Sequence, residues 1–231
     1  MSDYLVIIPC GGHGSRFASE LPKQYHQLLG QTVLDWTLQV FEHCAYISKI
    51  MVVASQNDCR IDGYANKYSK LQIVKVGGQT RAESVLNGLR ELQYATDDWV
   101  LVHDAARCCL RGEDLLRLIA SLQEHPIGGI LASKATDTIK QINAHQQITA
   151  TLDRNFIYQA QTPQMFKAQL LHQALSAAGD LVTDEASAVE QLGYLPQIID
   201  CGSHNFKITF SNDLKLAAIY LQEQIERATN V

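Results

Sequence analysis

Short apolar segments alternate with helical segments over the first half of the chain, and this alternation restricts the fold more than any other feature. Each apolar segment is rich in Ile, Leu and Val and is bounded by turn-forming residues, as buried strands are. Strands are predicted at 4–9, 50–54, 71–76, 99–103 and 128–132, and helices at 32–42, 61–68, 82–92 and 113–123. This order predicts an α/β fold in which helices cover both faces of a mainly parallel, twisted sheet.

The pattern changes after residue 132. Segments 138–142 and 147–152 alternate polar with apolar residues around a turn, which predicts a hairpin. An isolated hairpin is marginally stable in water, so we expect this one to pack on another surface such as a second subunit. Later elements are predicted as helices at 167–178 and 184–192, strands at 196–200 and 206–209, and a terminal helix with Ser211 as its N-cap. We expect a single domain over residues 1–231 with a projecting arm at 136–156.

The composition limits the partners of the chain. A formal net charge of −5 argues against general binding to nucleic acid or to an anionic membrane. The first apolar segment is far too short to span a bilayer. The six cysteines lack CxxC or zinc-type spacing, and the eight histidines lack HxH or HExxH spacing. These patterns predict reduced thiols in a cytoplasmic protein and give no indication of a zinc site.

A glycine-rich loop follows the first strand. The segment IIPCGGHGSRF places glycine at 11, 12 and 14, with Arg16 in the loop and Lys23 shortly after it. Successive backbone N–H groups in such a loop can form a concavity that binds anions. The segment lacks the Gly-Lys-Ser/Thr of a P-loop and the third glycine of the dinucleotide fingerprint. A loop with two cations is a plausible triphosphate site, although the glycines alone fit an ordinary turn equally well.

Other polar residues are expected at the same place. In parallel sheets ligands bind beyond the carboxyl ends of the strands, which brings loops 10–16, 77–81 and 104–107 together. Asp104 follows a predicted strand, where its carboxylate could hold Mg²⁺ against phosphates. Lys207 lies in a short apolar segment and needs an anionic partner if it points inward. Taken alone, Arg81 is typical of a solvated charge. Thr183 is typical of an N-cap, with the acids Asp184 and Glu185 in the first turn of the helix that follows.

Taken together, these segments resemble the cytidylyltransferase family of the non-mevalonate isoprenoid pathway, whose members join CTP to 2-C-methyl-D-erythritol 4-phosphate. The resemblance runs from about residue 6 to about residue 218. The matching segments are 9–16 with 22–25, 77–84, 102–107, 137–138, 153–155, 162–164, 183–188 and 207–209. The chain departs from the usual family pattern at Cys10, Gln79 and Cys108, which concerns base recognition more than phosphate chemistry.

The resemblance implies roles for individual residues. Four are implied to be catalytic: Arg16 and Lys23 on the triphosphate, and Arg154 and Lys207 on the acceptor phosphate. The implied CTP-binding residues are Pro9, Cys10, Gly11, Gly12, Gly14, Ser15, Gly78, Arg81, Ser84 and Asp104. The implied acceptor-binding residues are Asp104, Arg107, Thr138, Arg154, Thr162 and Lys207. In the family the arm crosses to a partner in a homodimer, so that Thr138 and Arg154 would complete the neighbour's site.

The resemblance also implies a reaction. An oxygen of the acceptor phosphate would attack the α-phosphorus of CTP in line, with Mg²⁺ present, and pyrophosphate would leave. The attacking oxygen is already anionic, so alignment and charge stabilisation suffice and no general base is needed. Two alternatives stay open: a cytidylyltransferase acting on ribitol 5-phosphate, and a nucleotide-binding regulator without catalysis.

Overall fold

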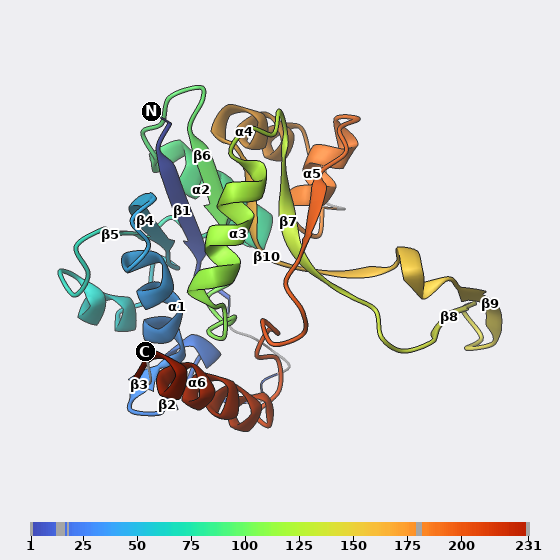
Figure 1. The fold of residues 1–231 in the computed structure, drawn as a ribbon. Helices are drawn as coiled ribbons and strands as arrows, with labels where there is room; N and C mark the ends of the chain where they lie inside the picture. The colour runs from blue at the N-terminus through green and yellow to red at the C-terminus, as the bar shows by residue number, and fades with distance from the viewer. Residues whose placement is uncertain (1, 13–16, 18, 179–181, 230–231) are drawn as a thin grey trace.

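A seven-stranded sheet forms the centre of the protein, with strand order β11-β7-β10-β6-β1-β4-β5 (Figure 1). The computed structural model describes residues 2–12, 17, 19–178 and 182–229. The strands are β1 (Tyr4–Pro9), β4 (Ile47–Val53), β5 (Leu71–Val74), β6 (Trp99–Val102), β7 (Gly128–Lys134), β10 (Tyr158–Lys167) and β11 (Gln197–Asp200). Only β10 runs antiparallel to its neighbours among these described strands. The predicted mainly parallel sheet is therefore confirmed.

Helices cover both faces of this sheet. They are α1 (Val33–Glu42), α2 (Arg81–Glu91), α3 (Gly112–Leu122), α4 (Ala168–Ala177), α5 (Glu185–Gln191) and α6 (Asp213–Thr229). Shorter elements are the 3-10 turns η2 (Lys23–Tyr25), η3 (Arg60–Tyr64) and η4 (Arg154–Phe156) and the strands β2 (Gln27–Leu28) and β3 (Gln31–Thr32). This is a Rossmann-like α/β architecture, as the alternation predicts.

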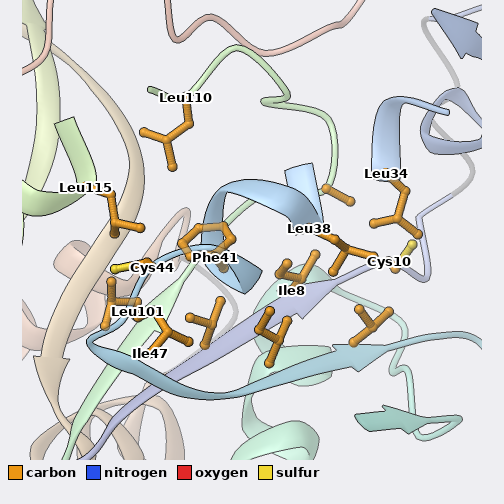
Figure 2. Close-up of a cluster of buried hydrophobic side chains, with 14 of the residues drawn as sticks. Ile8, Cys10, Leu34, Leu38, Phe41, Cys44, Ile47, Leu101, Leu110 and Leu115 are labelled. Carbon is orange, nitrogen blue, oxygen red and sulfur yellow. The ribbon is translucent and has the colours of Figure 1, made fainter. Parts of the chain in front are cut away.

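The alternation of side chains along β1 divides the core in two. Val6 and Ile8 point to one face, where they join side chains of α1 and α3 (Figure 2). Leu5 and Ile7 point to the other face, where they join side chains of α2, α4 and α5. Successive residues of a strand point to opposite faces, so a strand that is apolar at every position must be covered on both sides.

Helix α6 lies against the edge of the domain where the strands end. Ala217 and Leu221 of this helix are buried with Phe17, Cys109 and Ile208 in a third apolar cluster. Ile208 also donates its backbone N–H to the Ala106 carbonyl oxygen at 2.9 Å. These contacts fix the segment that carries Lys207 beside the loop after β6.

The arm stands away from the sheet (Figure 1). It carries the antiparallel hairpin of β8 (Ile139–Ile142) and β9 (Ile148–Leu152), which confirms the predicted hairpin. Several of its apolar side chains are exposed, among them Ile142, Ile148 and Phe156, which is 83% exposed. The arm thus carries an apolar surface that the described part of its own chain does not cover.

The structure corrects several local predictions. The predicted helix 61–68 is only the short turn η3, after which Asn66 takes a positive φ of 64°. Residues 206–209, all described, form an irregular segment where a strand was predicted. Helix α6 begins at Asp213, whose carboxylate accepts the N–H groups of Thr209 and Phe210, so the predicted cap at Ser211 is wrong.

Two further corrections concern the core. Strand β10 was not predicted, because its central Gln161-Thr162-Pro163 has the composition of a turn. The strand nevertheless lies between β6 and β7, with a register shift between Ala160 and Gln164. In α1 the fully buried side chains include Leu34, Leu38 and Phe41. Spacings of three and four residues predict one apolar helix face with Val33, Trp36, Thr37 and Val40, but Trp36 and Val40 are only partly buried.

Candidate active site

A cavity of about 240 Å³ lies beyond the carboxyl ends of β1 and β6. It is lined by Pro9, Cys10, Gly11, Gly12, Lys23, Gln24, Gly78, Gln79, Thr80, Arg81, Ser84, Asp104, Ala105, Ala106 and Lys207. Loops that are far apart in the sequence thus meet at one edge of the sheet, where a parallel sheet is expected to bind its ligand.

Most of the predicted nucleotide-binding residues line this cavity. The structure brings together Pro9, Cys10, Gly11, Gly12, Lys23, Gly78, Arg81, Ser84, Asp104 and Lys207. Gly14, Ser15 and Arg16 lie outside the described residues. Thr138 and Arg154 belong to the arm, and neither lines the cavity of its own chain. Arg107 and Thr162 lie behind the cavity wall, in contact with Asp104.

Asp104 is the centre of an ionic cluster. Its Oδ1 accepts the Arg81 Nε–H at 2.7 Å, and its Oδ2 lies 2.9 Å from Lys207 Nζ and 3.5 Å from Arg107 Nε. Burial opposes ionisation of the carboxyl group, but the three cations outweigh it and hold the pKa of Asp104 far below its usual range. The expected anionic partner of Lys207 is therefore Asp104. We call these four residues the Asp104 cluster.

A second carboxylate supports this cluster from behind. Glu185 is fully buried in the first turn of α5, and its two oxygens accept the Arg81 guanidinium at 2.6 and 3.0 Å. Asp184 caps α5, so the cap predicted at Thr183 is wrong by one residue. Sequence reasoning missed the role of Glu185, because an acid in the first turn of a helix has an ordinary structural explanation. The sequence does not reveal that Glu185, the first residue of α5, is fully buried, so its pairing with Arg81 could be recognised only in the fold.

A hydrogen-bonded chain runs from Asp104 into the core. The Asp104 N–H donates to Thr162 Oγ1 at 3.1 Å, and Thr162 Oγ1 lies 3.0 Å from His103 Nδ1. His103 Nε2 lies 3.2 Å from the Arg107 carbonyl oxygen, which can only accept, so Nε2 carries the proton and Nδ1 accepts from Thr162. Burial lowers the pKa of His103 to about 3, which keeps this imidazole neutral. It holds the loop after β6 in place.

The guanidinium group of Arg107 donates hydrogen bonds to backbone carbonyl groups of the protein itself. Its Nη1 donates to the Asn205 carbonyl oxygen at 2.7 Å and its Nη2 to the Ala160 carbonyl oxygen at 3.4 Å. Burial lowers its pKa, although Asp104 opposes that shift. Arg107 therefore joins three segments behind the cavity, including the one that carries Lys207.

Backbone contacts hold the glycine loops close together. A Cβ atom on Gly77 would lie 2.8 Å from the Ala54 carbonyl oxygen, so only glycine allows loop 77–81 to approach β4 so closely. Gly78 N–H donates to Ser84 Oγ at 3.0 Å, and that hydroxyl donates to the Thr80 carbonyl oxygen at 2.9 Å. Gln24 Nε2 donates to the Cys10 carbonyl oxygen at 3.0 Å. These contacts hold the backbone of the loops that line the cavity.

The charge of the described lining favours an anion. Lys23, Arg81 and Lys207 contribute three cations, while Asp104 is the lining carboxylate. Lys23 Nζ donates to the Ile208 carbonyl oxygen at 2.7 Å, which places its charge beside the segment of Lys207. Burial raises the pKa of the Cys10 thiol to about 12, so it stays protonated and offers no nucleophile at neutral pH. The cavity is suited to phosphate groups rather than to covalent thiol chemistry.

Asp104 does not fit the predicted role of a metal ligand in this arrangement. Mg²⁺ usually takes one or two carboxylates together with substrate oxygens. Here both Asp104 oxygens already face cations, and binding Mg²⁺ through them would bring a divalent charge against Arg81, Arg107 and Lys207. The donor set of the described cavity is therefore that of an anion site.

The fold and the site define a Rossmann-like α/β protein with a cationic cavity at the carboxyl edge of its sheet. A parallel sheet ends in glycine-rich loops around a small cationic cavity, and the cluster behind it holds its cations in place. Among the described residues, every helix is too short or too polar to span a membrane.

Comparisons with known proteins identify the family. The family model "2-C-methyl-D-erythritol 4-phosphate cytidylyltransferase" (IspD) matches residues 4–223. A protein of that name from Chromobacterium violaceum is 46% identical over 223 residues, which cover 96% of this chain and 99% of the relative. One from Laribacter hongkongensis is 44% identical over 96% of this chain and 97% of the relative.

Solved structures agree with the sequence relatives. A crystal structure of a 4-diphosphocytidyl-2C-methyl-D-erythritol synthase has a TM-score of 0.84 at 40% identity, covering 96% of this chain and 99% of that one. The cytidylyltransferase of Thermus thermophilus has a TM-score of 0.74 at 27% identity, covering 94% of this chain and 98% of that one. The chain belongs to the 2-C-methyl-D-erythritol 4-phosphate cytidylyltransferase family.

Proposed function

We propose that this protein transfers CMP from CTP to 2-C-methyl-D-erythritol 4-phosphate and releases pyrophosphate. Membership of the family supports the reaction and the substrates. The observation that carries the proposal to this chain is the Asp104 cluster at the cavity. It holds the cations Arg81 and Lys207 beside the glycine loops, where two phosphorylated substrates would have to meet.

The nucleotide takes the part of the cavity nearest the glycine loops. The backbone at 10–12 and at Gly78 offers donors and acceptors to the base and the ribose, and Lys23 faces the triphosphate. Arg16 acts with Lys23 in this proposal, as the resemblance implies. Together they would stabilise the charge that spreads over the phosphoryl oxygens as the bond to pyrophosphate lengthens.

The acceptor takes the part of the cavity nearest Lys207. Lys207 Nζ lies 2.9 Å from Asp104 Oδ2. The Lys207 side chain is 36% exposed, so its ammonium group can also reach a phosphate oxygen. Asp104 limits the motion of this lysine and thereby aims the acceptor phosphate at the α-phosphorus. Because the attacking oxygen is already anionic, the residues need only align it and screen its charge.

A divalent cation enters the proposal as part of the nucleotide. CTP would bind as its Mg²⁺ complex, with phosphate oxygens as the ligands that Mg²⁺ prefers. The chain's own contribution is the fixed positive charge of the cavity lining.

The protein acts as a homodimer in this proposal. The exposed apolar side chains of the arm provide a surface for a second copy, and the arm residues Thr138 and Arg154 lie away from their own cavity. Each arm would then bring these two residues to the acceptor part of the neighbour's cavity. The cysteines of the described chain are free thiols, in keeping with a cytoplasmic enzyme.

Pyrophosphate release tests this proposal. Purified protein is given CTP and Mg²⁺ with either 2-C-methyl-D-erythritol 4-phosphate or ribitol 5-phosphate. Fast release with the first acceptor is the expected result. Release with ribitol 5-phosphate alone would overturn the acceptor assignment, and CTP binding without release from either would favour a regulator.

A further inference from the structure

A second group of metal-ligating side chains lies outside the cavity, where α3 meets the segment after β11. Asp114 comes from the first turn of α3, Cys201 directly follows β11, and His204 lies three residues further on. One ligand atom from each lies within 4.8 Å of the other two. Asp114 and Cys201 are buried, and His204 is partly buried. Three different donor types thus converge at one point, distinct from the phosphate-binding cavity.

The donor types select a class of ion. A thiolate, an imidazole nitrogen and a carboxylate oxygen are the ligands that Zn²⁺ takes in tetrahedral sites, often with a fourth position left for water. Mg²⁺ and Ca²⁺ prefer oxygen donors, so a cysteine in the set argues against them. The set suits a thiophilic divalent cation of the Zn²⁺ type.

The carboxylate is already oriented for this role. Arg117 donates to Asp114 Oδ1, while His204 Nε2 lies 2.7 Å from Asp114 Oδ2. Arg117 also donates to the Asp200 carbonyl oxygen at 3.1 Å, which ties α3 to the end of β11. An outer partner of this kind fixes a ligating carboxylate in its binding orientation.

An unpartnered buried atom lies beside the group. Asn205 directly follows His204 in the chain and is fully buried. Its Nδ2 donates to Gln161 Oε1 and to the Thr162 carbonyl oxygen, so the amide cannot be flipped. Its Oδ1 has no hydrogen-bond partner among the described residues. A buried oxygen of this kind calls for a polar guest such as an ion with its bound water.

We propose that Asp114, Cys201 and His204 bind one thiophilic divalent cation of the Zn²⁺ type. On binding, the Cys201 thiol releases its proton to solvent. The Nε2 proton that His204 donates to Asp114 also leaves Nε2 through solvent, so that the neutral imidazole coordinates through Nε2 with its one proton on Nδ1. No electron is transferred. The ion joins α3 to the segment 201–207, whose Asn205 carbonyl oxygen accepts from Arg107 and whose Lys207 pairs with Asp104. The site therefore fixes the segment that carries a cavity lysine.

Sequence spacing gives no sign of this site, because Asp114 is far from Cys201 and His204 in the sequence. The competing explanation is a cluster held by hydrogen bonds alone, in which Asp114 accepts from His204 and Arg117. The two explanations differ in whether a thiolate–metal bond can form.

Cobalt absorption spectroscopy distinguishes them. The full-length protein is stripped with a chelator, kept reduced and titrated with Co²⁺, which replaces Zn²⁺ and absorbs light. We expect a thiolate-to-cobalt band in the near ultraviolet and strong visible bands of tetrahedral cobalt, saturating at one ion per chain and lost when Zn²⁺ is added. Absence of these bands at excess Co²⁺ would overturn the proposal.

Matched variants assign the ligands. Cys201→Ser should remove the near-ultraviolet band, and His204→Gln should keep it while weakening Co²⁺ binding by about 10–100-fold or more. Cys59→Ser changes the exposed cysteine and should leave both bands unaltered. If the bands disappear in Cys59→Ser and persist in Cys201→Ser, the ion binds elsewhere and the proposal is wrong.

A thermal measurement guards against misfolded variants. Zn²⁺ that binds only the folded chain raises its melting temperature. The shift is measured for each protein with and without Zn²⁺, so a lower starting stability of a variant does not affect the comparison. We expect equal shifts in the unsubstituted protein and in Cys59→Ser, and a smaller shift in His204→Gln at the same Zn²⁺ concentration. An equal shift in His204→Gln would contradict the assignment.

Discussion

Glu185 and Arg81 form a two-pronged ion pair, with Nη1–Oε1 at 2.6 Å and Nη2–Oε2 at 3.0 Å. Each residue is the first of its helix, α5 and α2 respectively, and their separation in sequence is 104 residues. The pair leaves the Arg81 Nε–H free to reach Asp104, so the buried Glu185 orients a cation that lines the cavity. Glu185, whose position in a first helical turn has an ordinary structural explanation in the sequence, thus supports the candidate active site through Arg81.

Removing the charge of Glu185 should destabilise the protein. Glu185→Gln leaves the largely buried guanidinium of Arg81 without its strongest partner, and we expect a loss of about 3 kcal/mol in the free energy of unfolding. Urea denaturation measures it, with Glu190→Gln on the exposed side of α5 as the matched control. Replacing both partners, as Arg81→Met with Glu185→Leu, should cost less than Glu185→Gln alone. Additive losses would show that the two residues do not interact.

Lys23→Ala should slow catalysis while leaving the fold intact. Lys23 lines the cavity, and losing one fixed charge at a phosphoryl group typically lowers kcat by about 10²–10³-fold. Steady-state pyrophosphate release and a melting curve measure the two effects. Lys215→Ala, at an exposed position of α6, is the control and should match the unsubstituted protein. Near-normal turnover by Lys23→Ala with a native melting curve would exclude the catalytic role.

His103 should make the protein less stable as the pH falls below neutrality. In the unfolded chain a histidine has a pKa of about 6.5, whereas the folded value is lowered to about 3. Between these values the unfolded chain binds one more proton, so stability falls by up to about 1.4 kcal/mol for each pH unit of acidification. The Asp104 contribution is present above the unfolded carboxyl pKa of about 3.9 and is lost only in stronger acid.

Urea denaturation at several pH values between about 7 and about 4.5, inside the window set by the two histidine pKa values, tests this slope. We expect His103→Gln to be less stable at neutral pH but to show a flatter dependence on pH in this range. His43→Gln, at an exposed position, should keep the original slope. An unchanged slope in His103→Gln would show that another group titrates.

Mixed dimers should recover activity from two inactive variants. Lys23→Ala damages the cavity and Arg154→Ala damages the arm, so one site of a mixed dimer combines an intact cavity with an intact arm. After random exchange of subunits we expect about a quarter of the unsubstituted activity, because half of the dimers are mixed and each has one working site. The separate variants are the controls. If mass spectrometry verifies that subunits have exchanged and no activity is recovered, Arg154 acts in the site of its own chain.

Asp104→Asn should alter the acceptor kinetics and leave the Mg²⁺ dependence unchanged. The carboxylate pairs with Lys207 and Arg81, so its neutralisation should raise KM for the acceptor and lower kcat. If phosphate oxygens alone hold Mg²⁺, the Mg²⁺ concentration for half-maximal rate should stay the same. A large increase in that concentration would restore Asp104 as a metal ligand.

Much of the fold follows from local patterns in the sequence. Strand β1 is apolar at every position and ends in Pro9 before the glycine loop, which identifies a strand covered on both faces. Thr32 and Asp35 form a capping box at the start of α1, where a helix was predicted. Such signals involve residues within a few positions of one another, so they can be read without the fold.

The sequence also placed the cavity in outline. Loops after β1, β5 and β6 meet because the carboxyl ends of parallel strands share an edge, and Asp104 and Lys207 pair there as their types suggest. The family resemblance added expected roles for Lys23, Arg81 and Ser84, which a single residue considered alone does not reveal.

Only the tertiary structure decided the remaining features. The strand character of β10, the ion pair of Glu185 with Arg81 and the group of Asp114, Cys201 and His204 depend on segments that are far apart in the sequence. The pairing of a strand with both its neighbours overrides a turn-like composition. Glu185 pairs with Arg81 because the fold buries both side chains together, and the residue type alone does not predict this pairing. The packing of helices on the sheet determines which side chains from distant segments are buried together. Local sequence patterns do not contain that information.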